Sequence, residues 1–182
     1  AMHREAPEVH LIAKANAAMP EWKRDADVNA WLLAGEYQRV LDWYASLTSR
    51  NDEDRSFAAW AHVDLGNRDA ADAAKYVESD LPAARRLWTA AAERYAQALA
   101  IKPDMHEAAY NWCGMLLTQY HLLKPSAPDE AAPLLDQAEK LALRAESIRP
   151  GSATYNLACI HSLKGDLSAA LEALRTAHAA NA

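Results

Sequence analysis

Apolar residues recur along this chain at helical spacing, and strand-like alternation never extends beyond a few residues. Proline and glycine divide the pattern into segments. Pro20 and Pro82 stand where segments begin, and Gly35 and Gly165 stand in short turns between segments. We therefore predict an all-α fold of about nine helices. Their expected ranges are 4–19, 22–34, 36–49, 53–78, 82–101, 105–122, 130–148, 152–164 and 167–180.

Two stretches of the chain match each other at a constant offset of 47 residues. The aligned pairs are Ala91 with Ala138, Ala98 with Ala145, Ile101 with Ile148, Lys102 with Arg149 and Pro103 with Pro150. A Tyr-Asn pair follows each proline at nearly the same distance, at 110–111 and at 155–156. Alanines seven residues apart on one face let two helices approach closely, and a proline ends the helix before it. A unit of helix, proline and second helix therefore occurs twice.

Polar side chains at the expected helix starts are candidates for helix caps. We expect Ser79 or Asp80 to cap the helix that Pro82 opens, and Asp129 to cap the helix at 130–148. The acidic run 52–54 is expected to be a solvated helix start, which the helix dipole favours.

Composition supports a helical core and gives little sign of a nucleic-acid partner. Apolar residues make up 51% of the 182 residues, with many alanines and only one phenylalanine. The net charge of −6 argues against nucleic-acid binding, which usually needs a basic face. Residues 51–80 carry three basic and eight acidic side chains, whereas 81–103 carry four and one. These neighbouring segments either attract each other or face solvent, or the acidic one docks a basic partner.

The sequence lacks the usual signatures of catalysis, metal binding and membrane insertion. No glycine-rich phosphate loop is present, and His106-Glu107 lacks the second histidine of a zinc-protease motif because Tyr110 stands there. The two cysteines, Cys113 and Cys159, are expected to be buried thiols in a reducing, cytoplasmic setting. No apolar run reaches the ~18 residues of a membrane span. We expect no catalytic residue, no metal and no cofactor, and we expect that the protein is not an enzyme.

The segment 153–177 resembles a tetratricopeptide repeat. Its small residues Ala158, Ala170 and Ala177, its glycine turn at Gly165 and its apolar Leu174 match the positions of that family's motif. Further matches are Ala91, Tyr95, Ala98 and Pro103 in a second repeat, and Gly35, Tyr37 and Tyr44 in a third. The resemblance covers roughly residues 21–181. The middle spacing of 47 residues exceeds the usual ~34 of this family, so the repeats resemble its irregular, extended bacterial type.

The resemblance implies a right-handed α-solenoid of antiparallel helix pairs, whose first helices line a concave groove. It divides the chain into an N-terminal helix or cap at 1–20 and a repeat domain at 21–182, with units near 21–52, 53–103, 104–150 and 151–182. The implied groove residues are Tyr110, Asn111, Gly114, Leu117, Thr118, Tyr155, Asn156, Cys159 and Ser162. Asn111 and Asn156 either grip the backbone of an extended peptide, as in some family members, or serve only packing. The basic clamp that other members use for a terminal carboxylate is missing from these positions.

We therefore expect a scaffold that binds a peptide or protein partner in the groove. A secretion-type chaperone or regulatory subunit, and an accessory domain of a larger enzyme, remain alternative roles. The last expected helix, 167–180, carries Leu167, Leu171 and Leu174, and no following helix meets its outer side. We expect this edge to be covered by a second copy in a homodimer, by a downstream domain or by the partner.

Overall fold

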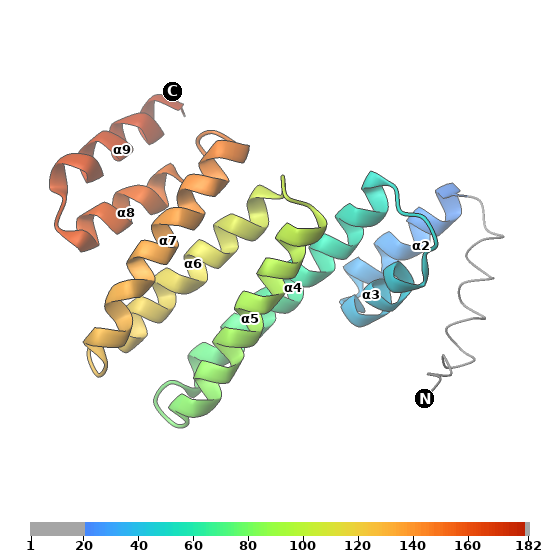
Figure 1. Ribbon diagram of the computed structural model, residues 1–182, viewed down its shortest axis with the longest axis horizontal. Helices are drawn as coiled ribbons and strands as arrows, with labels where there is room; N and C mark the ends of the chain where they lie inside the picture. The colour runs from blue at the N-terminus through green and yellow to red at the C-terminus, as the bar shows by residue number, and fades with distance from the viewer. Residues whose placement is uncertain (1–20, 181–182) are drawn as a thin grey trace.

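The computed structural model describes residues 21–180, and every regular element in that range is an α-helix (Figure 1). The all-α prediction is therefore confirmed for these residues, and the expected helix 4–19 lies outside them. The helices are α2 (Glu21–Leu33), α3 (Tyr37–Ser46), α4 (Asp52–Tyr76), α5 (Leu81–Ile101), α6 (His106–Leu123), α7 (Pro128–Ile148), α8 (Thr154–Lys164) and α9 (Leu167–Ala180). Their bounds agree with the predicted ranges to within a few residues.

Consecutive helices pack side by side as pairs, and the pairs follow one another from α2 and α3 at one end to α8 and α9 at the other (Figure 1). The closest pairs are α4 with α5, α6 with α7, and α8 with α9. In addition, α6 contacts α4, and α8 contacts α6. The first helices of the three pairs therefore lie next to one another. The acidic and basic segments of the sequence are the paired helices α4 and α5.

The 47-residue repeat is visible in the structure at the ends of α5 and α7. The amide of Lys102 donates to the carbonyl of Ala98 at 2.8 Å, and the amide of Arg149 donates to the carbonyl of Ala145 at 2.8 Å. Both cap residues leave the helical conformation immediately before a proline, which disfavours the helical region for the preceding residue. All four aligned alanines are completely buried between helices.

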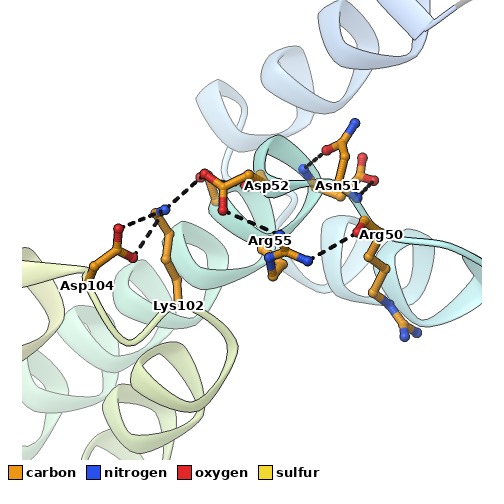
Figure 2. Close-up of polar contacts among 8 residues, drawn as sticks. Arg50, Asn51, Asp52, Arg55, Lys102 and Asp104 are labelled. Atoms are coloured by element: carbon orange, nitrogen blue, oxygen red, sulfur yellow. Dashed lines mark hydrogen bonds and ion pairs between the residues drawn. The ribbon is translucent and has the colours of Figure 1, made fainter.

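The side chain at each of these caps reaches back to the first residue of the paired helix. Lys102 lies 3.2 Å from a carboxylate oxygen of Asp52 and 3.2 Å from one of Asp104, and Asp52 also pairs with Arg55 (Figure 2). Arg149 repeats the arrangement, with its guanidinium 3.2 Å from Nε2 of His106. These contacts close the α4–α5 and α6–α7 pairs in the same way.

The described helices enclose two apolar clusters that share α4. The smaller cluster contains Val28, Val40, Trp43 and Ala61, so it joins α2 and α3 to the beginning of α4. The larger cluster extends from α4 to α8 and is built largely from alanines, with larger side chains such as Trp88 and Tyr95 between them. Helices that meet at alanines pack closely, and the larger side chains fill the space where the helices are further apart.

The structure decides between two expected caps for α5 and corrects two other expectations about helix starts. Asp80, not Ser79, caps α5 by accepting from the amide of Ala83 at 2.9 Å. Helix α7 begins at Pro128, so Asp129 lies in its first turn and does not cap it. Asp54 is buried rather than solvated, because it accepts from the amide of Asn51 while Asn51 accepts from the amide of Asp54, each at 2.8 Å.

Candidate functional site

A cavity of about 320 Å³ opens where the first helices of three pairs meet. Helix α4 contributes Asn67 and three alanines to its wall, α5 contributes Trp88 and Tyr95, and α8 contributes Asn156. Helix α6 contributes Tyr110, Asn111, Gly114, Met115 and Thr118. Five predicted groove residues line this cavity. They are Tyr110, Asn111, Gly114, Thr118 and Asn156.

Each first helix places one asparagine in this cavity. Asn67, Asn111 and Asn156 are separated by 44 and 45 residues, so they occupy equivalent places on α4, α6 and α8. Asn67 was not predicted as a groove residue. The only sequence signal for it was its spacing from Asn111, because no Tyr precedes it and no proline stands at the matching distance before it.

The three amides differ in the hydrogen bonds that they already make. Asn67 accepts from the hydroxyl of Tyr95 at 2.7 Å and also bonds to the carboxylate of Asp64. Asn156 donates to the sulfur of Cys113 at 3.7 Å. The Asn111 amide makes no side-chain hydrogen bond to any other residue in the described part of the chain. Since an amide both donates and accepts, Asn111 has its full bonding capacity open to a ligand.

Two ionisable groups behind the cavity stay neutral. Burial, with a smaller effect from Asp69 and Asp64, raises the pKa of Tyr95 well above its usual value, so its hydroxyl remains a donor. Burial likewise raises the pKa of the Cys113 thiol to about 11, against a smaller opposing effect of its bond to Asn156. A thiol with this pKa is a poor nucleophile at neutral pH.

A second, polar cavity of about 640 Å³ shares Tyr110 and Asn111 with the first. Its other walls are the start of α6 and the 149–152 turn, including His106 and Arg149. The carboxylate of Glu146 fixes this turn by accepting hydrogen bonds from the amides of Gly151 and Ala153 and from the hydroxyl of Thr154. Asn111 therefore lines both the cavity between α4, α6 and α8 and this polar cavity.

The remaining predicted groove residues do not join this site. Tyr155, Cys159 and Ser162 lie on the flank of α8 that faces α9, in an apolar groove of about 580 Å³. The side chain of Asn156 points instead toward α6, where it donates to the sulfur of Cys113. Leu117 is partly buried against the larger apolar cluster and lines neither cavity. Eight of the nine predicted residues therefore line two separate surfaces, five in the cavity and three in the groove beside α9.

The described residues contain no group of three or more His, Cys, Asp and Glu side chains that could hold a metal ion. His62 is the histidine most enclosed by protein, and burial and the nearby charge of Arg94 lower its pKa to about 4. It is therefore neutral at physiological pH. None of the helices in the described range is both long enough and apolar enough to cross a membrane.

No protein-family model matches this chain, and none of the curated proteins matches its sequence significantly.

Proposed function

We propose that this protein is a tetratricopeptide-like, right-handed helical solenoid that binds an extended segment of a protein partner across α4, α6 and α8, and that it is not an enzyme. The observation that carries the proposal is the row of three asparagines, one from each first helix, in a single cavity. Amide side chains at regular intervals suit the peptide backbone, which presents donors and acceptors in turn.

The small residues of the cavity support a backbone ligand. Ala70, Ala71 and Ala74 of α4 and Gly114 of α6 all line it, and a Cβ atom added at Gly114 would meet nothing within 4 Å. Space of this kind lets a partner backbone approach the helices closely. Because the polar cavity shares Tyr110 and Asn111, a segment that crosses Asn111 would place a neighbouring side chain beside Arg149 and His106.

The bonding state of the amides predicts their order of importance. Asn111 offers a donor and an acceptor, Asn156 offers its carbonyl oxygen, and Asn67 is engaged by Tyr95 and Asp64. We therefore expect Asn111 to contribute most to binding and Asn67 least. Both cysteines are free, which supports a reducing, cytoplasmic setting for this function.

The test begins with peptides selected from a random displayed library on the wild-type chain. Asn111→Ala together with Asn156→Ala should weaken the selected peptides by about 1–3 kcal/mol, because two or more backbone bonds are lost. Gly114→Leu should block them by filling the cavity. Gln97→Ala, on an exposed face of α5 away from the cavity, is the matched control and should leave the affinity unchanged. Peptides that bind the first two variants as tightly as the wild type would refute the proposal.

A further inference from the structure

Helix α9 exposes a stripe of leucines at the C-terminal end of the described chain. Leu167, Leu171 and Leu174 are 66%, 56% and 42% exposed, and their spacing places them on one helix face. With Tyr155 of α8, which is 67% exposed, they line the apolar groove of about 580 Å³ between the two helices. A contiguous exposed apolar patch on a protein surface is often an interaction site.

The internal repeat identifies these positions as ones that are buried elsewhere in the molecule. Ala170 and Ala177 of α9 correspond to the alanine pairs of α5 and α7, which are also seven residues apart. Three residues before the first alanine stand Trp88, Leu135 and Leu167, with exposed fractions of 2%, 6% and 66%. Three residues before the second stand Tyr95, Ala142 and Leu174, with exposed fractions of 1%, 0% and 42%. Only the α9 members of both sets are exposed.

The structure also shows what covers the equivalent positions. Helix α6 packs on α5, with the ring of Trp112 stacked on that of Tyr95 at a centroid distance of 6.3 Å, and α8 packs on α7 in the same manner. The groove between α8 and α9 is therefore shaped to receive another helix with an apolar face.

We propose that the helix in this groove is α9 of a second copy of the chain, in a two-fold symmetric dimer. The leucine stripe lines the groove and is also the apolar face of a 14-residue helix. In a two-fold symmetric dimer, this surface of one copy can therefore pack against the same surface of the other copy. The charged side chains Glu172 and Arg175 lie off the stripe and pair with each other at 3.7 Å. Because neither of these two side chains lines the groove, burying the leucines there does not bury this ion pair.

The area of the stripe is compatible with a weak to moderate dimer. At these exposures Tyr155 and the three leucines present on the order of 400 Å² of surface. A standard interface buries about 800 Å² per partner, so these four side chains supply about half, and the flanking parts of the groove at Cys159 and Ser162 extend it. Dimerisation would cover Tyr155, Cys159 and Ser162 and leave the cavity beside Asn111 open.

Sedimentation equilibrium of the full chain from about 1 to 300 µM tests the proposal. The weight-average mass of the wild type should rise from 20.0 kDa toward twice that value. Leu171→Glu should raise the dissociation constant at least about tenfold. The matched control is Leu143→Glu, which changes a leucine of α7 that is 54% exposed and lies outside the groove, and it should dimerise like the wild type.

A second readout guards against misfolding of the variants. Because a dimer is stabilised by mass action, the midpoint of thermal unfolding should rise with concentration for the wild type and Leu143→Glu, and not for Leu171→Glu. A wild-type mass that stays at 20.0 kDa throughout overturns the proposal. Equal loss of association in both variants overturns it as well. Growth beyond two copies also contradicts it, because a two-fold contact closes on itself.

Discussion

Two glycines in the interiors of helices α4 and α6 should respond in opposite directions to the same substitution. Gly66 of α4 lies where α5 crosses it, and a Cβ atom there would come within 3.0 Å of the Tyr95 ring and 3.3 Å of the carbonyl oxygen of Ala91. Gly114 of α6 borders the cavity, and its added Cβ would meet nothing within 4 Å. Gly66→Ala and Gly114→Ala therefore differ mainly in their surroundings.

The expected free energies of unfolding follow from two opposing effects. Replacing glycine by alanine in a helix interior stabilises by about 0.5–1 kcal/mol, and Gly114→Ala should gain that amount. At Gly66 the ring of Tyr95 must move, although its hydroxyl bonds to Asn67 at 2.7 Å and its ring stacks on Trp112. Overpacking of this kind costs about 1–3 kcal/mol. Gly66→Ala should therefore lower the free energy of unfolding by about 1–2 kcal/mol.

Urea unfolding followed by helical circular dichroism measures both changes, provided that the slope with denaturant is unchanged. The two variants should be separated by about 1.5–3 kcal/mol, the sum of the gain and the loss. If Gly66→Ala were as stable as Gly114→Ala, α4 and α5 could move apart slightly without a loss of stability. That result would refute the argument that their close approach requires a glycine.

Three further predictions concern single side chains. The pKa of His62 is lowered from 6.5 to about 4, so its contribution to stability is complete above pH 6.5 and is lost progressively as the pH falls from 6.5 to 4. Between pH 7 and pH 4.5 the wild type should therefore lose about 2 kcal/mol more free energy of unfolding than His62→Gln, in urea titrations at both pH values. Asn51→Ala removes the capping box of α4 and should cost about 1 kcal/mol, whereas the exposed Ser49→Ala just before it should cost almost nothing in the same assay. Glu146→Gln weakens the hydrogen bonds that hold the turn after α7. It should lower the free energy of unfolding by about 1–2 kcal/mol, and an unchanged midpoint of thermal unfolding would contradict this role.

The helices could be predicted because their limits are set by local chemistry. Helices α5 and α7 each end two positions before a proline, because proline disfavours the helical conformation of the cap residue that precedes it. Gly35 and Gly165 adopt φ angles of +75° and +83° in the turns where they were expected. The repeated alanines could be assigned to the core because a seven-residue spacing keeps them on one helix face.

The site could be predicted only in part, because it depends on how helices distant in sequence pack together. Asn67 becomes a site residue only when α4 lies beside α6. Tyr155 and Asn156 are adjacent in sequence, yet they line different surfaces. Which surface each residue lines depends on how α8 packs against α6 and α9. The burial of Asp54 was missed for a related reason, since a carboxylate in an acidic run appears solvated until its bond to the amide of Asn51 is known.

The sharing of α4 by two apolar clusters has a consequence for how the molecule loses its structure. Trp43 packs edge-on against Phe57 at a centroid distance of 6.2 Å, and such contacts attach α2 and α3 to the first turns of α4 alone. Those turns can fray while the larger cluster, which holds the asparagines in place, remains intact. In native-state hydrogen exchange, the amides of α3 should therefore exchange through an opening of lower free energy than the amides of α5 and α6. The N-terminal helix pair can then vary in sequence, or be remodelled, without disturbing the surface around Asn111.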